Sequence, residues 1–282
     1  MQMIYFYALF GVDMAFFSKK KIKKNYGDKN AVIISVSAQK GGVGKTTFST
    51  NFAVSLALKG KKVLIMDLDS QAHTQEALYF HFGDNESEFS DYIMDSKKDL
   101  MNSVYMSKVD NLYYVPADKD LARTEKLLSS EIGKEFIIKK LLDVPKTHFD
   151  FIIIDTPPHF GNLTLASLVA SKYVVIPTEL SNLSIDGIND LLENMELIVD
   201  NYNNDIDILG IIINKVDYRA RKTNEPILTE LKTRFNDYLT EPYIPLSTLF
   251  KKSQLEGKSI FHYDKKHKIS LLFDELSENL IK

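Results

Sequence analysis

The chain has 282 residues, of which 44% are hydrophobic and 26% are charged, and this length is sufficient to bury one large hydrophobic core. The formal net charge is −3. Any binding to nucleic acid would therefore require a local basic patch, because the protein as a whole does not attract polyanions. The sequence contains no cysteine, which excludes disulfides, thiolate catalysis and cysteine-held zinc or iron–sulfur centres.

Residues 1–17 (MQMIYFYALFGVDMAFF) form an apolar segment, and the lysine-rich run KKKIKK follows at 19–24. A secretory signal has the opposite order, and Asp13 leaves the apolar run too short to span a bilayer. Three interpretations stay open: a packed or poorly ordered extension with translation starting at Met14, a helix that docks on a partner subunit, and a weak contact with membrane or DNA. We expect a cytoplasmic protein without stable membrane insertion, an N-terminal extension over 1–30 and a single domain over 31–282.

The first folded residues predict a strand, a glycine-rich loop, a helix and a second strand. The run AVIISVS at 31–37 is typical of a strand buried on both faces. The segment FSTNFAVSLALK at 48–59 places apolar residues on successive turns, and Gly60 after it suits a helix C-cap. KVLIMDL at 62–68 is the next strand. Together these segments predict one βαβ unit with the glycine loop at its first turn.

Strands and helices continue to alternate along the rest of the chain. The expected helices lie at 121–140, 162–171, 185–201, 226–239 and 269–281. Further strands are expected at 112–115, 151–154, 173–176 (ended by Pro177) and 208–213, with a short edge strand at 243–245. Strands separated by helices favour a parallel sheet. We predict an α/β fold of three layers, in which a mostly parallel twisted sheet lies between helices.

The glycine-rich loop reads QKGGVGKTT and departs from the usual phosphate-loop pattern GxxxxGK[ST], because Gln39 occupies the first glycine position. The physical features of a phosphate loop remain. Glycines allow positive φ, which turns backbone N–H groups toward phosphate oxygens, and the following helix points its positive end at the same anion. Lys45 can reach the β- and γ-phosphates, and Thr46 can offer a hydroxyl to Mg²⁺. The predicted nucleotide-binding residues of the loop are Lys40, Gly41, Gly42, Val43, Gly44, Lys45, Thr46 and Thr47.

Lys40 is the distinctive residue of this loop, because it lies five positions before Lys45 and would be held near the same phosphates. Two lysines at one triphosphate fit a subunit that donates one of them across an interface. The loop resembles the signature KGGxGK[ST] of the ParA/MinD family of deviant Walker-type P-loop ATPases. That resemblance implies ATP and Mg²⁺ as cofactors and an ATP-bound sandwich homodimer. Lys40 would act on the partner's nucleotide as an arginine finger does.

The resemblance covers the chain from about residue 31 to its end. VLIMDLDSQ at 63–71 is similar to the family's strand ending in DxDPQ, and this implies that Asp69 positions or activates the attacking water. FIIIDTPP at 151–158 is similar to the Walker B strand, whose aspartate, here Asp155, holds Mg²⁺ through water. Asp67 either contributes to the metal site or only orders the loop. The implied catalytic residues are Lys40, Lys45 and Asp69.

Three later blocks also resemble the family, and the first of them is YVVIPT at 173–178. IIINKVD at 211–217 places Asn214 where a family residue contacts adenine, although Asn is also a common turn residue. PLSTLFKKSQLEGKSIFHY at 245–263 is similar to the tail pattern IPxSxxxxxAxxxGxxIxxY and is the loosest of the matches.

The remaining features separate members of the family. The absence of cysteine excludes nitrogenase-reductase-like members, and the tail lacks the tyrosines of bacterial tyrosine-kinase relatives. MinD-like members end in a basic amphipathic helix that inserts into membranes. Here the segment 269–282 has Asp274, Glu275 and Glu278 on its polar face, which anionic lipid would repel. A helix packed on the core is the better interpretation.

We therefore expect a DNA-segregation ATPase of the short ParA type. The resemblance implies non-specific binding to double-stranded DNA, nucleoid association and a ParB-type adaptor that stimulates slow ATP hydrolysis. About thirty residues precede the first strand, which leaves no room there for the helix-turn-helix domain of longer plasmid ParA proteins. The alternative functions are a MinD-like membrane-associated ATPase and an ATPase that positions another cargo. The candidate DNA contacts, which can equally be ordinary solvated surface residues, are Lys215, Arg219, Arg221, Lys222, Arg234, Lys251 and Lys252.

Overall fold

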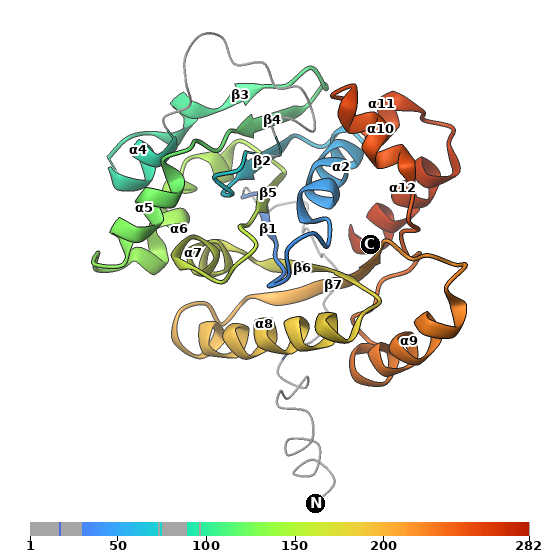
Figure 1. The fold of residues 1–282 in the computed structure, drawn as a ribbon. Helices are drawn as coiled ribbons and strands as arrows, with labels where there is room; N and C mark the ends of the chain where they lie inside the picture. The colour runs from blue at the N-terminus through green and yellow to red at the C-terminus, as the bar shows by residue number, and fades with distance from the viewer. Residues whose placement is uncertain (1–16, 18–29, 73, 75–88, 96, 282) are drawn as a thin grey trace, which may run out of the picture.

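The computed structural model describes Phe17 and residues 30–72, 74, 89–95 and 97–281 (Figure 1). The apolar segment 1–16 and the lysine run at 19–24 lie outside the described residues, so the three interpretations of the N-terminal extension stay predictions. Phe17 itself is buried among side chains of the α8 and β7 region. The Tyr238 hydroxyl donates a hydrogen bond to the carbonyl oxygen of Phe17.

The core of the fold is a seven-stranded sheet with the order β3-β4-β2-β5-β1-β6-β7. All neighbouring strands are parallel except β3, which pairs antiparallel with β4. This confirms the predicted α/β class and the mostly parallel sheet. The strands are β1 (Val32–Val36), β2 (Val63–Asp67), β3 (Tyr105–Met106), β4 (Leu112–Val115), β5 (Phe151–Asp155), β6 (Tyr173–Glu179) and β7 (Asp207–Asn214).

Helices cover both faces of this sheet, which gives the three predicted layers (Figure 1). On one face lie α2 (Lys45–Leu58), α10 (Thr248–Leu255), α11 (Ile260–Tyr263) and α12 (Lys268–Ile281). The other face carries α4 (Phe89–Met94), α5 (Leu121–Leu128), α6 (Ile137–Leu141), α7 (Asn162–Ala170) and α8 (Asn182–Asn201). α9 (Arg221–Phe235) packs beside β7 at the edge of the sheet.

Alternating side chains of the central strands enter the two apolar layers. In β5, Phe151 and Ile153 pack toward α2 and α12, whereas Ile152 and Ile154 pack toward the opposite helices. Every residue of β2 and β5 is buried. Strands covered on both faces read as continuous apolar runs because neither face meets water. This explains why the sequence predicted these strands well.

Three expected elements differ in the structure, and the first two are a helix and an edge strand. The expected helix at 121–140 is broken into α5, a 3-10 turn (Lys134–Phe136) and α6. Gly133, at the start of that turn, has φ +74, a left-handed conformation that interrupts helical geometry and that glycine tolerates. The expected edge strand at 243–245 is not a strand. Pro245 forms only an isolated bridge with Val216.

Strand β6 does not end before Pro177, as the sequence predicted, but continues through it to Glu179. The carbonyl oxygen of Val175 accepts a hydrogen bond from Ser37, so Val175 faces β1. Pro177 lies two residues further and faces the same side, beyond the last β1 residue, Val36. No ladder hydrogen bond is therefore lost at the missing N–H of proline. On its other side, β6 stays paired with β7 up to Asn214.

Candidate nucleotide site

The glycine-rich loop connects the carboxyl end of β1 to α2. Gly42 and Gly44 have φ +77 and +93, the left-handed region that glycine adopts without strain. The helix begins at Lys45, directly after Gly44, so its unpaired N–H groups and positive dipole end lie at the loop. Such an arrangement binds phosphate. The sequence predicted both the strand–loop–helix order and the need for glycine here.

The end of β7 holds the loop in place. Asn214 Nδ2 donates to the Val43 carbonyl oxygen at 2.8 Å, and its Oδ1 accepts from the Lys215 backbone N–H at 2.8 Å. The Lys215 ammonium donates to the Gly42 carbonyl oxygen. A Cβ atom on Gly44 would lie 2.3 Å from Asn214 Nδ2, so this close approach also requires glycine. Asn214 thus packs against the phosphate loop, and adenine contact by this residue stays a prediction.

Buried charged groups gather behind the loop. The Lys45 side chain is only 7% exposed, and burial lowers its pKa, while the nearby charges of Asp155 and Asp69 oppose that shift. Asp155 is fully buried at the end of β5. Its Oδ1 accepts a hydrogen bond from Ser49 Oγ at 2.9 Å, and Thr46 also bonds to its carboxylate. Lys45, Thr46 and Asp155 therefore lie close together. The sequence predicted this, although Asp155 is far from the other two in the chain.

Asp67 faces Asp155 across the β2–β5 pair. The Asp67 carboxylate accepts the backbone N–H of Asp69 at 2.9 Å and that of Thr74 at 3.2 Å. Burial, followed by the charge of Asp155, raises the pKa of Asp67 well above its ordinary value. Both of its oxygens accept backbone N–H groups of the segment after β2, and a contribution of Asp67 to the metal site stays a prediction.

Burial disfavours the charged forms of both Asp67 and Asp155 and raises their pKa values. Burial is the largest cause that raises the pKa of Asp155 to about 6, although hydrogen bonds from Thr46 and Ser49 and the charge of Lys45 lower it. Among the described residues, no group of three or more His, Asp or Glu side chains could hold a metal ion. A divalent cation here would rely on Thr46, on water-mediated contact with Asp155 and on ligands brought by a nucleotide. Hard oxygen donors of this kind fit Mg²⁺.

A cavity of about 570 Å³ lies over these groups. Asp69 lines it, and its Oδ1 accepts the Gln71 backbone N–H at 3.1 Å. Pro158, from the loop after β5, lines it as well. The other lining residues are Gly41, Gly42, Gly44, Lys45, Thr46, Thr47, Gln71, Lys215, Lys251, Gln254 and Leu255. A polyphosphate in this cavity would meet the loop, Lys45 and Asp69 together.

Lys40 points toward β6 and α8 and does not line this cavity. Its ammonium forms an ion pair with Glu179, at the end of β6, and donates to Ser181 Oγ at 3.0 Å. The Lys40 and Glu179 side chains are both 29% exposed. Within this subunit, Lys40 is therefore held beside the phosphate loop at an accessible surface.

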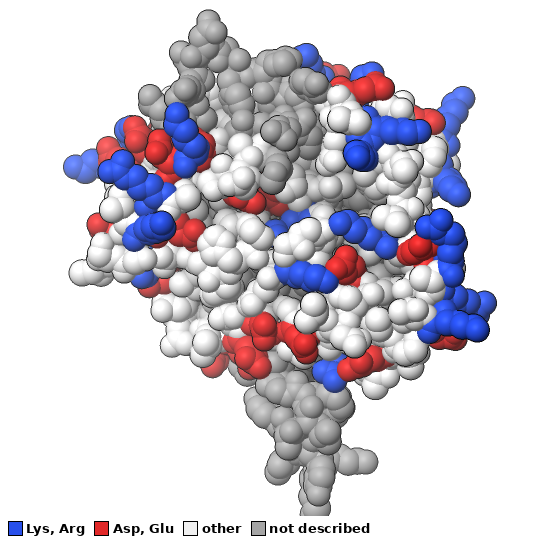
Figure 2. Space-filling view, viewed as in Figure 1, with Lys and Arg blue, Asp and Glu red and all other residues white. Residues whose placement is uncertain are grey.

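The candidate DNA contacts do not form one cluster. Lys215 and Lys251 line the nucleotide cavity, Arg219 pairs with Asp217, and Arg234 pairs with Glu230 at 2.7 Å. Exposed basic side chains at the start of α9 and on α10 are Arg221, Lys222, Lys252 and the cavity residue Lys251. Figure 2 shows Lys and Arg side chains along the side formed by α9 and α10, whereas acidic side chains gather over α8. α8 contains five acidic residues and no Lys or Arg.

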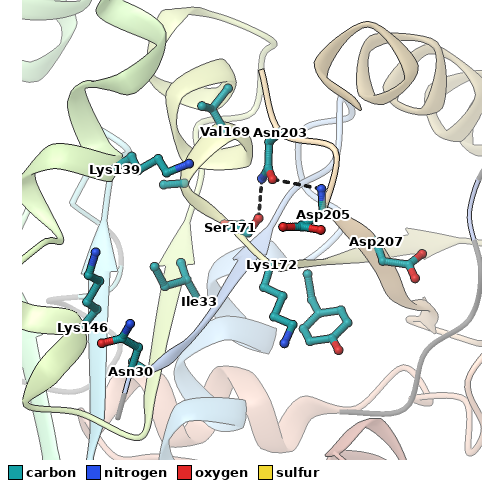
Figure 3. Close-up of a pocket in the computed structure, with 13 residues that line it drawn as sticks. Asn30, Ile33, Lys139, Lys146, Val169, Ser171, Lys172, Asn203, Asp205 and Asp207 are labelled. Carbon is teal, nitrogen blue, oxygen red and sulfur yellow. Dashed lines mark hydrogen bonds between the residues drawn. The ribbon is translucent and has the colours of Figure 1, made fainter. Parts of the chain in front are cut away.

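A larger cavity of about 1000 Å³ lies at the opposite, amino end of β1, β6 and β7 (Figure 3). Asn203 Nδ2 donates to the Ser171 carbonyl oxygen at 2.7 Å, and Asn203 Oδ1 accepts from Asp205. Lys146 pairs with Asp143. These side chains already have partners and do not converge on a common point. In open α/β sheets, ligands bind at the carboxyl ends of the strands, so this cavity gives no indication of a ligand site.

Sequence reasoning did not identify Ser49, Thr74, Glu179, Ser181 or Gln254 as part of the site. Ser49 follows Lys45 by one helical turn, so the helix periodicity could have placed it beside Asp155. The Thr74 hydroxyl donates to Asp155 Oδ2 at 3.4 Å, and no local pattern indicated that contact. Gln254 Nε2 donates to Thr47 Oγ1 at 3.2 Å, which depends on how α10 packs.

Comparison with known proteins decides the family. A family model described as an AAA domain matches residues 31–208. The sporulation initiation inhibitor protein Soj of Bacillus subtilis is 33% identical over 248 residues, which cover 88% of this chain and 97% of that protein. The chain belongs to the ParA/MinD family of P-loop ATPases. The chromosome-partitioning ATPase Soj of Treponema pallidum is 32% identical over 86% of this chain and 94% of its own length.

A solved structure shows that a protein with a similar fold is named for a different chemical reaction. Cobyrinic acid a,c-diamide synthase from Mycobacterium smegmatis, solved with a bound ATP analog and magnesium, has a TM-score of 0.74 and 25% identity. The match covers 88% of this chain and 93% of that one. That protein is named as a synthase, so the fold alone does not specify the use to which a nucleotide is put. The function must be argued from the residues of the site.

Proposed function

We propose that residues 31–282 form an ATPase domain that binds ATP and Mg²⁺ and forms an ATP-dependent homodimer, and that the dimer binds DNA non-specifically in a partition system. The observation that carries the proposal is the pair of lysines in the loop. Lys45 is buried behind the phosphate loop, whereas Lys40 lies at an accessible surface beside it. A second subunit would bring its own Lys40 to the opposite nucleotide. The ATP-dependent dimer would then release DNA when a ParB-type adaptor stimulates ATP hydrolysis.

Each residue of the site would have a separate role in ATP hydrolysis. The loop N–H groups and Lys45 would bind and orient the phosphates, and Thr46 and Asp155 would hold Mg²⁺, which neutralises charge on the phosphates. Asp69 would orient the attacking water and accept its proton. The partner's Lys40 would stabilise charge that develops in the transition state. Until the dimer closes, this last contribution is missing, so slow turnover is expected of a single subunit.

A MinD-like membrane-associated ATPase is the alternative. The last helix, α12, does not support it, because Phe273, Leu276 and Leu280 of α12 are buried in the core. Asp274 and Glu278 of the same helix pair with Lys59, which directly follows α2. Of the helices in the described part of the chain, none is long and apolar enough to cross a membrane. ATPases that position another cargo remain the third possibility.

DNA retention and liposome flotation separate the first two functions. The protein is expected to bind DNA with ATP and to release DNA with ADP. The affinity for DNA should fall steeply as the salt concentration rises, because such binding depends on counterion release. The protein should not float with anionic liposomes. Flotation with ATP in the absence of DNA retention would reject the partition proposal. A nucleoid-associated location in the cytoplasm follows from the same proposal.

The start of α9 is the expected DNA contact. α9 carries four basic and two acidic residues, and Arg221 and Lys222 are exposed. The double variant Arg221→Ala/Lys222→Ala is expected to weaken DNA binding about ten-fold. The slope of log affinity against log salt concentration should become shallower by roughly two, one for each lost phosphate contact. Lys139→Ala/Lys140→Ala on α6 removes the same charge elsewhere and should leave DNA binding unchanged. Equal losses in both variants would show that the net charge alone matters.

Glu179 is expected to restrain Lys40 before dimerisation. Glu179→Gln removes the ion pair but keeps the shape of the side chain, so the ATP-dependent dimer should form at about three- to five-fold lower protein concentration, as expected for a partly exposed ion pair. Analytical ultracentrifugation with ATP measures this shift. Weaker dimerisation of Glu179→Gln would show instead that Glu179 positions Lys40 within the dimer.

A further inference from the structure

Helix α10 forms a wall of the nucleotide cavity. Lys251, Gln254 and Leu255 line the same cavity as the phosphate loop. The helix is fixed to that loop, because Gln254 Nε2 donates to Thr47 Oγ1 at 3.2 Å. Its other side is anchored in the core through the buried residues Leu249 and Ser253. The three lining residues therefore lie beside the loop.

Lys251 and its neighbour Lys252 have different surroundings. Lys251 lies three residues before Gln254, on the same side of the helix, and it lines the cavity. Both lysines are exposed, but Lys252 is not among the residues that line the cavity. The sequence placed both lysines together among the candidate DNA contacts. The structure separates them, because neighbouring positions on a helix do not face the same way.

Besides Lys45, which the proposed function assigns to the phosphates, Lys215 and Lys251 line this cavity. The Lys45 side chain is buried at the loop, and the Lys215 ammonium is bonded to the Gly42 carbonyl oxygen. In the part of the chain that the structure describes, the Lys251 ammonium makes no hydrogen bond or ion pair. A flexible, strongly hydrated cation beside a phosphate loop suits contact with a polyanion.

We infer that Lys251 binds the phosphates of the nucleotide held by its own subunit, and that it does so from α10 and not as part of a DNA surface. This inference rests on the proposed nucleotide site. The bond from Gln254 to Thr47 places α10 at the loop, whose backbone cradles the α- and β-phosphates. Lys251 thus meets the part of the nucleotide that ADP and ATP share. Lys251 is a binding residue in addition to Lys45, and it needs no partner subunit.

The test is the affinity of ADP and ATP for Lys251→Ala, with Lys252→Ala as the matched control. Lys251→Ala is expected to bind both nucleotides about ten-fold more weakly, the loss expected for one charge-assisted hydrogen bond. Lys252→Ala should stay within about two-fold of the unsubstituted protein. Isothermal titration of each nucleotide with Mg²⁺ gives these constants, and thermal melting without nucleotide checks that both variants are folded.

Several outcomes would overturn the inference. Equal nucleotide affinity in the two variants would remove Lys251 from the site, and a loss of DNA retention in Lys251→Ala without any change in nucleotide affinity would return it to the DNA surface. A loss confined to ATP would place it at the terminal phosphate and contradict the shared contact. Failure of the unsubstituted protein to bind ATP would instead reject the proposed nucleotide site, so the two failures are distinguishable.

Discussion

Lys40→Ala is expected to bind ATP normally, to stay monomeric in ATP and to lose at least about a hundred-fold in turnover, since charge supplied in trans is worth roughly 10³–10⁵ in related phosphoryl transfer. Binding should be spared because Lys40 does not line the cavity of its own subunit and instead contacts Glu179 and Ser181. Nucleotide titration, ultracentrifugation with ATP and phosphate release measure the three properties separately.

The contrast with Lys45→Ala makes the Lys40 result specific. Lys45 is buried behind the loop and lies near Asp155 and Asp69, so its removal should weaken nucleotide binding itself. If Lys40→Ala weakened binding to the same extent, both lysines would act on the same nucleotide. Normal turnover by Lys40→Ala would show that no lysine is donated across an interface.

The parts of the fold that the sequence predicted well are those with a strong local pattern. β2 and β5 are buried on both faces, so each reads as a continuous apolar run. The glycine loop is equally local, because positive φ at Gly42 and Gly44 requires glycine whatever surrounds it. The expected convergence of Lys45 and Asp155 came from the resemblance of residues 151–158 to the Walker B strand. In the structure β1 and β5 are parallel neighbours, so the loops that follow them meet at one edge of the sheet.

The parts that were missed depend on packing between distant segments. Pro177 stays within β6 because β1 ends before reaching it, and the sequence around Pro177 does not contain that fact. The contact of Lys40 with Glu179 joins residues 139 positions apart. Lys251 and Lys252 look alike in the sequence, and only the orientation of α10 separates them. Side-chain roles at the rim of the site therefore required the structure, whereas the phosphate loop did not.

Asp67, the last residue of β2, and Asp69, which follows the strand, should respond very differently to substitution. Asp69 lines the cavity, and its carboxylate accepts one local backbone N–H, from Gln71. Asp69→Ala is expected to keep the fold, the affinity for ATP and the ATP-dependent dimer. Its turnover should fall by about a hundred-fold or more, because a positioned acid–base group contributes roughly 10²–10⁴. The variant should therefore accumulate as a dimer in ATP, which size-exclusion chromatography with light scattering detects.

Asp67→Ala provides the matched comparison. The Asp67 carboxylate is buried and accepts the backbone N–H groups of Asp69 and Thr74. Its removal leaves both donors without a partner, at about 1–3 kcal/mol each, and relief of the repulsion with Asp155 offsets this loss only in part. Asp67→Ala should thus melt at a lower temperature than Asp69→Ala. Monomeric Asp69→Ala in ATP would contradict the role of Asp69 in hydrolysis, because a subunit that cannot hydrolyse ATP should remain in the closed dimer.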